Sequence, residues 1–311
     1  MNTEAVLTAI LAAALVGSVP LMLASVGEAI GERSGLLNLG IEGVLLASGL
    51  AGFWVALESG NSALGLLSGA GVGLVLGLVF GVLTAICRAD QVMLGLGATM
   101  AGLGGTAFVF REVWGSDQPL LAASAGRPLD DVLDWLPVIG PAIGQMRWPG
   151  FLAWALVGGI HLWMQRSRQG LQVRAAGESP LGLEASGGNV ARLRLFAAAI
   201  AGTLTGFGGA YLTTIDLGLF TPGVVAGIGF MAVAVAMLGR RNPLRVALFA
   251  LAFGLLTGLG NGLQLAGISV RPEFLRMIPY IGVVASLVLL GRDRSAPAAL
   301  GVVYRGFAGR R

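Results

Sequence analysis

Five amide or carboxylate side chains lie inside otherwise apolar stretches of this sequence: Asn38, Glu42, Gln91, Asn261 and Gln264. Such groups are costly in hydrocarbon, so they are the first candidates for lining the path of a polar solute. Asn38 and Glu42 are four residues apart and are expected to share a helix face, beside glycines that can break the helix. The alternative, which weighs equally, is that Glu42 satisfies neighbouring backbone groups or Arg33.

The sequence lacks the residue sets that most enzyme chemistry requires. All 20 basic residues are arginine, which excludes the phosphate loop of ATPases because that loop needs a lysine. The single cysteine, Cys87, and the single histidine, His161, provide neither a disulfide framework nor a Cys/His metal site. No Ser/His/Asp set with plausible geometry and no HExxH motif is present. We therefore expect a non-catalytic chain that binds no metal or cofactor itself.

The composition is that of a helical membrane protein. Hydrophobic residues make up 55% of the 311 residues, charged residues only 12%, and the mean hydropathy is +0.82, which excludes a soluble globular domain. The pI of about 10.2 comes from arginines at the ends of apolar runs. An excess of arginine in cytoplasmic loops explains that pattern, so no nucleic-acid partner is expected.

A helix needs roughly 20 apolar residues to cross the hydrocarbon core, and this criterion predicts nine spans. They cover residues 5–25, 36–57, 63–86, 91–110, 150–164, 195–217, 223–238, 244–266 and 275–291. Arginines in 165–194, in 239–245 and in the tail 292–311 place these segments in the cytoplasm. The N-terminus and the loop 111–149 then lie outside. This loop is either a cap for a partner that docks from outside or an ordinary connector.

Glycines at four-residue spacing indicate an internal repeat. They are Gly69, Gly73, Gly77 and Gly81 in the third predicted span and Gly254, Gly258 and Gly262 in the eighth. Each set forms a bare helix face on which another helix can pack closely. If residues 5–110 correspond to residues 195–291, the single linking span 150–164 makes the second copy enter the membrane from the opposite side. We predict one domain over residues 1–311 with inverted four-span repeats.

The longest polar run, residues 165–194, contains five arginines and two glutamates. Within it, residues 178–187 have a mixture of Ser, Pro, Leu, Glu and Ala that favours a short surface helix, which Gly187 and Gly188 end. A short helix across the cytoplasmic mouth can act as a lever through which a separate motor protein drives this chain.

Three stretches resemble one family of membrane permeases. Residues 167–212, SRQGLQVRAAGESPLGLEASGGNVARLRLFAAAIAGTLTGFGGAYL, are similar to the signature region of permeases for ATP-driven uptake of branched-chain amino acids, simple sugars and nucleosides. Residues 31–49 and 239–254 resemble the same family, most closely its nucleoside branch. The resemblance covers the chain from about Gly27 to Gly291.

The resemblance implies the transmembrane subunit of an ABC importer, with the type II-like fold, in the cytoplasmic (inner) membrane of a bacterium. It also implies a second, related permease, a cytoplasmic ABC ATPase that binds ATP and Mg²⁺, and an extracytoplasmic solute-binding lipoprotein. The coupling segment of the family is carried over onto Gly177, Glu178, Ser179, Pro180, Leu181, Gly182, Leu183, Glu184, Ala185, Ser186 and Gly187. This chain has Ser179 where the family commonly has Asn or Asp.

Two classes of function are consistent with the sequence. The first is an ABC permease for nucleosides or for a simple sugar, in which the motor pushes on residues 177–187. The second is a secondary carrier driven by an ion gradient, which inverted repeats would serve equally well. A carrier needs a titratable centre in mid-membrane, for which only Glu42 is a fair candidate.

Overall fold

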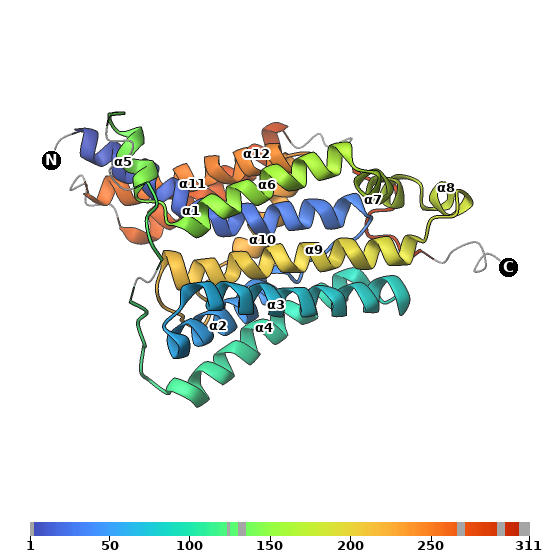
Figure 1. Cartoon of the computed structure of the whole chain (residues 1–311), viewed down its shortest axis with the longest axis horizontal. Coiled ribbons are helices and arrows are strands. Elements are labelled where there is room, and N and C mark those ends of the chain that lie inside the picture. The colour runs from blue at the N-terminus through green and yellow to red at the C-terminus, as the bar shows by residue number, and fades with distance from the viewer. Residues whose placement is uncertain (1–2, 123–124, 130–134, 266–270, 291–295, 305–311) are drawn as a thin grey trace.

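The computed structural model describes residues 3–122, 125–129, 135–265, 271–290 and 296–304, and within them every regular element is a helix (Figure 1). The elements are α1 (Thr3–Arg33), α2 (Ile41–Ser59), α3 (Ser62–Gly81), η1 (Val82–Ile86), α4 (Gln91–Trp114), α5 (Ile139–Gly144), α6 (Trp148–Arg166), α7 (Arg168–Glu178), α8 (Pro180–Ala185), α9 (Val190–Tyr211), η2 (Leu212–Asp216), α10 (Ile228–Leu238), α11 (Pro243–Leu265) and α12 (Pro272–Leu290). The segments η1 and η2 are short π-helical turns that extend α3 and α9.

Six helices, counted over the described residues, are long and apolar enough to cross a membrane. They are α1, α2, α3 with η1, α4, α9 with η2, and the described part of α11. Helices α6, α10 and α12 occupy the other three predicted ranges, but their described residues do not meet the same criteria. The chain is therefore a multi-pass helical membrane protein, and the number of nine spans stays a prediction.

The centre of the bundle is formed by α1 and α9, which run antiparallel and touch through their backbones (Figure 1). A Cβ atom on Gly27 would lie 2.8 Å from the carbonyl oxygen of Ala201. A Cβ atom on Gly208 would lie 3.1 Å from the carbonyl oxygen of Pro20. Small residues thus bring the two helices into direct contact, as is common where helices pack in a membrane.

The first helix is longer than the predicted span 5–25, because α1 continues to Arg33. The additional turns contain two buried carboxylates, and both have partners inside the protein. Glu28 accepts a hydrogen bond from the backbone N–H of Asn38 at 3.0 Å, and Glu32 forms an ion pair with Arg241. Paired acidic groups can remain inside a helix bundle, where unpaired ones would be expelled.

The four predicted packing glycines of α3 lie against α9: Gly69, Gly73, Gly77 and Gly81. A Cβ atom on Gly73 would overlap the carbonyl oxygen of Gly202, and one on Gly69 would overlap the side chain of Ala210. No larger residue fits at either position without moving α3 away from α9.

Helix α11 packs on α1 through glycines, as α3 packs on α9. Gly254 faces Ala14 and Ser18, and Gly258 faces Ile10 and Ala14. On the other side of the bundle, Gly69 and Gly73 of α3 face Gly202, Gly206 and Ala210 of α9. Both contacts thus use glycines at four-residue spacing.

Helices α2 and α10 begin inside the bundle. The end of α1 lies beside the start of α9, where Arg194 Nε donates to the carbonyl oxygen of Ser34 at 3.1 Å. Leu45, near the start of α2, instead contacts Gly209, near the end of α9. Residues 34–40 therefore run back into the bundle before α2 starts.

The predicted spans 36–57 and 223–238 are wrong at their starts, because the helices begin only at Ile41 and Ile228. Both preceding segments contain glycines with positive φ, +91° at Gly35 and +89° at Gly227, a conformation that interrupts a right-handed helix. With 11 residues, α10 is too short to cross the hydrocarbon core alone.

Candidate functional site

Glu42 lies where the two internal helix starts meet. Its side chain is buried, and its carboxylate oxygens accept hydrogen bonds from the backbone N–H groups of Gly227 at 2.7 Å and Gly229 at 2.8 Å. Both donors belong to the N-terminus of α10, which carries the positive end of the helix dipole. Glu42 therefore caps α10 and joins two parts of the chain that are 185 residues apart.

Asn38 lies in the irregular segment before α2. Its Oδ1 atom accepts a hydrogen bond from the backbone N–H of Gly40 at 2.9 Å. The prediction that Asn38 and Glu42 share a helix face is wrong, because the chain is helical only from Ile41 onward. The two side chains point in different directions. Glu42 is directed at the start of α10, and Asn38 lines the cavity described below.

The irregular backbone before α2 is satisfied by side chains from neighbouring helices. Gln91 Oε1 accepts from the backbone N–H of Leu37 at 2.7 Å. Glu28 Oε1 accepts a hydrogen bond from the backbone N–H of Asn38. The hydroxyl of Thr99 donates a hydrogen bond to the carbonyl oxygen of Leu39 at 3.0 Å. Non-helical backbone at membrane depth requires such partners. Gln91 thus has a positioning role, and Glu28 and Thr99, which the sequence pattern does not single out, share it.

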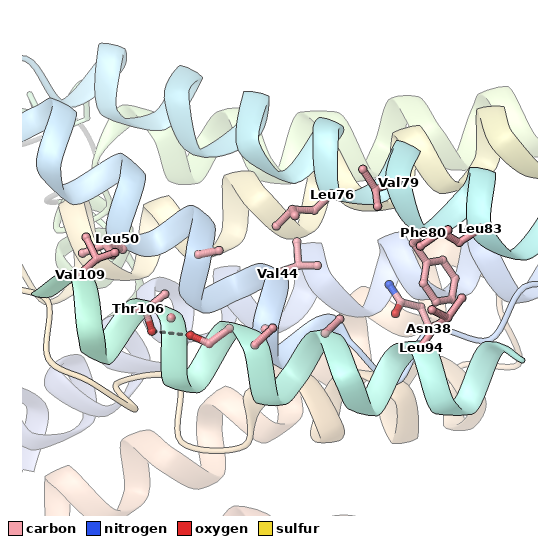
Figure 2. Close-up of a pocket in the computed structure, with 16 residues that line it drawn as sticks. Asn38, Val44, Leu50, Leu76, Val79, Phe80, Leu83, Leu94, Thr106 and Val109 are labelled. Carbon is pink, nitrogen blue, oxygen red and sulfur yellow. Dashed lines mark hydrogen bonds between the residues drawn. The ribbon is translucent and has the colours of Figure 1, made fainter. Parts of the chain in front are cut away.

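A cavity of about 420 Å³ lies between α2, α3 and α4 (Figure 2). Figure 2 shows Asn38 at one end, near Phe80 and Leu94, and Leu50 and Val109 at the other end. The walls are mostly apolar or glycine, so Asn38 contributes much of the hydrogen-bonding capacity. Of the three predicted path residues whose side chains the structure describes, only Asn38 lines this cavity.

Two further predicted path residues, Asn261 and Gln264, lie in the last turns of α11. Their side chains fall outside the described residues, as do the surroundings of the predicted packing residue Gly262. Their assignment therefore stays a prediction.

The predicted coupling segment, residues 177–187, contains the end of α7 and the short helix α8. Glu178 is the last residue of α7, and α8 covers only Pro180–Ala185. Ser179 separates them and accepts a hydrogen bond at Oγ from the backbone N–H of Gly182 at 3.3 Å, with proline directly after it. Serine is a favourable N-cap, and proline fits the first helical position. Ser179 therefore caps α8, and the short helix predicted within 178–187 is present, with its start at Pro180 and not at Glu178.

Helix α8 projects from the bundle at the end where α1 stops, opposite the end that holds α5 (Figure 1). Gly182, Ala185, Ser186 and Gly187 are exposed, whereas Leu183 is buried. The exposed residues of α8 and of the turn after it are thus small, so that a partner can approach the backbone closely.

The coupling segment is connected to the end of α1 through Arg33. Its Nη1 atom lies 3.7 Å from Glu178 Oε1, and its Nη2 atom donates to the carbonyl oxygen of Arg240 at 3.1 Å. The exposed ion pair contributes little free energy alone. One residue earlier, Glu32 forms a fully buried ion pair with Arg241. The end of α1 therefore contacts both α7 and the turn between α10 and α11.

Among the described residues, no group of three or more His, Cys, Asp or Glu side chains could hold a metal ion. The polar groups instead position backbone segments, at the α2–α10 junction and at the α7–α8 end. The fold and these two sites define a multi-pass helical membrane protein with an internal polar junction and a protruding surface helix.

The chain belongs to the family described as branched-chain amino acid transport system / permease component, which matches residues 10–290. It is 31% identical to the nucleoside ABC transporter permease protein NupC of Lactococcus lactis, over 98% of this chain and 99% of that protein. It is also 31% identical to the guanosine ABC transporter permease protein NupQ of Bacillus subtilis, over 98% of each chain.

A protein of Haloferax volcanii, named provisionally as the glucose ABC transporter permease TsgC13, is 33% identical over 86% of this chain and 80% of its own length. No solved structure matches the chain.

Proposed function

We propose that this chain is the transmembrane subunit of an ATP-driven ABC importer for nucleosides. The observation that carries the proposal is the similarity, over nearly the whole chain, to two permeases named for nucleoside and guanosine transport. Membership of a permease family disfavours the carrier driven by an ion gradient. The two backbone hydrogen bonds that occupy the carboxylate of Glu42 disfavour it as well.

The α7–α8 end is the cytoplasmic end. Most arginines of the described segments gather there: Arg33, Arg88, Arg166, Arg168, Arg174, Arg192, Arg194, Arg240, Arg241 and Arg245. The opposite end carries fewer: Arg111, Arg127, Arg147 and Arg271. This asymmetry follows the rule that arginine is retained on the cytoplasmic side. The N-terminus then lies outside and the tail inside, and the membrane is the cytoplasmic membrane.

Transport uses two inverted repeats, α1–α4 and α9–α12. The glycine contacts of α3 on α9 and of α11 on α1, which have the same four-residue spacing, support this assignment. The internal starts of α2 and α10 are corresponding elements, and interrupted helices of this kind form solute sites near the bilayer midplane in many transporters. Asn38 and Glu42 lie at this junction, with Gln91 behind it, and the two repeats rock about it.

The importer contains three further proteins. A cytoplasmic ATPase, which holds ATP and Mg²⁺, docks on residues 177–187, because α8 protrudes there with a surface of small residues. A solute-binding lipoprotein docks at the α5 end. A second, related permease completes the path across the lipid bilayer.

The second candidate solute is a simple sugar, which the 33% identity to the Haloferax protein favours. Nucleosides and sugars share the hydroxyl groups that an amide such as Asn38 can bind, but only nucleosides carry a planar base. Competition between a labelled nucleoside and excess glucose therefore separates the two.

The test is uptake by proteoliposomes that contain the permease complex purified from its native membrane. We expect an ATPase and a second permease to copurify, and labelled guanosine to accumulate only with internal ATP and external binding protein. Accumulation that an ionophore abolishes, and that ATP does not affect, would contradict the proposal. Glucose uptake without nucleoside uptake would support the ABC importer but show that its solute is a sugar and not a nucleoside.

A further inference from the structure

The C-terminal segment 296–304 lies against the coupling segment and the end of α1. The backbone N–H of Ala299 donates to the carbonyl oxygen of Gly177 at 2.9 Å. The backbone N–H of Gly301 donates to the carbonyl oxygen of Gly35 at 3.1 Å. These two hydrogen bonds connect the tail to α7 on one side and to the residues after α1 on the other.

Arg194, in the first turn of α9, holds the same three segments together. Its side chain is almost fully buried, with 1% of the residue exposed. The guanidinium donates to the carbonyl oxygens of Ser34 at 3.1 Å, Val302 at 3.1 Å and Ala299 at 3.4 Å. A planar guanidinium with five N–H donors can bind several carbonyl groups at once, which the ammonium of lysine cannot do with the same geometry. The carbonyl-rich end of α1 also stabilises the positive charge.

Two glycines make this close approach possible. At Gly35, where φ is +91°, an added Cβ atom would lie 2.6 Å from Arg194 Nη2 and 3.0 Å from the carbonyl oxygen of Ala299. At Gly177, an added Cβ atom would overlap the carbonyl oxygen of Arg33. At this junction, α1, α7 and the tail therefore approach one another so closely that residues larger than glycine do not fit at Gly35 and Gly177.

The tail also reaches α8. Tyr304 packs against a small apolar cluster formed by Ala176, Leu183 and Val190. Its hydroxyl donates a hydrogen bond to Glu184, near the end of α8. One segment of the tail thus contacts α7, α8, α9 and the end of α1.

We propose that residues 296–304 are a C-terminal strap that fixes the coupling segment to the end of α1, with Arg194 as the positioning residue. A push on α8 then moves α1, the central helix of the bundle, instead of bending α7–α8 alone. This inference rests on the proposed function, because it assigns a transmission role to a segment on which an ATPase is expected to dock.

The first measurement is amide hydrogen exchange of the purified full-length chain. The Arg194→Lys variant should exchange faster than wild type in residues 177–187, by about tenfold, because loss of a few net hydrogen bonds lowers the free energy of local opening. The matched control is Arg192→Lys on the same turn of α9, where the side chain is exposed and wild-type exchange is expected.

Two further variants make the test independent of whether Arg194→Lys folds. Removal of residues 296–311 should accelerate exchange in 177–187, whereas removal of 305–311 alone, which leaves the strap complete, should not. Tyr304→Phe removes only the hydroxyl that contacts Glu184 and should accelerate exchange in α8 alone. Unchanged exchange in all the strap variants would overturn the inference.

The second measurement is the number of guanosine molecules taken up per ATP hydrolysed by the reconstituted complex. We expect Tyr304→Phe and Arg194→Lys to lower this ratio while the ATPase still copurifies. An unchanged ratio despite faster exchange would overturn the transmission role. If wild type itself shows no ATP-dependent uptake, the proposed function fails, whereas the exchange result still decides whether the strap holds α7–α8.

Discussion

At the scale of residues, the polar groups inside this protein act mainly on the backbone of other segments. Glu42 caps α10, Gln91 holds the segment before α2, and Ser179 caps α8. Sequence position alone does not distinguish such a role from contact with a solute, because both place a polar side chain in an apolar stretch. Asn38 differs from the others, since it also lines the cavity between α2, α3 and α4.

The cap by Glu42 leads to a stability prediction. Glu42→Ala leaves the buried N–H of Gly229 and the partly buried N–H of Gly227 without their acceptor, and an unsatisfied buried group costs about 1–3 kcal/mol. We expect a clearly lower melting temperature in detergent, followed by tryptophan fluorescence, and a smaller loss for Glu42→Gln, which keeps one acceptor oxygen. Glu58→Ala, at an exposed position of the same helix, is the control. Equal melting temperatures for the two alanine variants would contradict the cap.

At the scale of elements, the fold depends on helices that touch through glycine. The four-residue spacing in α3 and α11 predicts close helix faces, and the structure gives each face its partner: α9 for α3, and α1 for the described glycines of α11. Both contacts have the same four-residue spacing, and the internal repeat stays a prediction.

The α3–α9 contact can be tested with two alanine substitutions on one helix. Gly73→Ala should destabilise the protein by about 1–3 kcal/mol, because the added Cβ atom overlaps the backbone of Gly202. Gly71→Ala should be neutral or stabilising by up to about 1 kcal/mol, because nothing lies within 4 Å of its added Cβ atom and alanine is the better helix former. Thermal unfolding of both variants measures the difference. The same sign of change in both would contradict the assigned packing face.

Hydropathy and charge were sufficient to predict an all-helical membrane fold, but they misplaced the helices that start inside the bundle. Residues 36–40 are apolar enough to be counted in a span, and only the three-dimensional arrangement shows that they are held by Gln91, Glu28 and Thr99. In the same way, Glu32 and Arg241 lie far apart in the sequence, so their buried ion pair could not be inferred from either residue.

At the scale of the whole molecule, the two ends of the bundle differ in chemistry. One end carries α7, α8, the strap and most of the arginines, and the other carries α5 and the start of the chain (Figure 1). Arg33 and the adjacent Glu32 connect the first end to the turn after α10. Since Glu42 caps the start of α10, a continuous set of contacts runs from the proposed ATPase surface to the internal junction.

The central claim is that residues 177–187 transmit the work of a separate ATPase. The most direct measurement is ATP-driven guanosine uptake by the reconstituted complex with Ala185→Arg, which places a large charged side chain on the exposed surface of α8. Gln172→Arg, at an exposed position of α7 outside this segment, is the control. We expect Ala185→Arg to abolish uptake with unchanged melting temperature, and Gln172→Arg to retain it. Normal ATP-driven uptake by Ala185→Arg would contradict the proposal that residues 177–187 transmit the work of the ATPase.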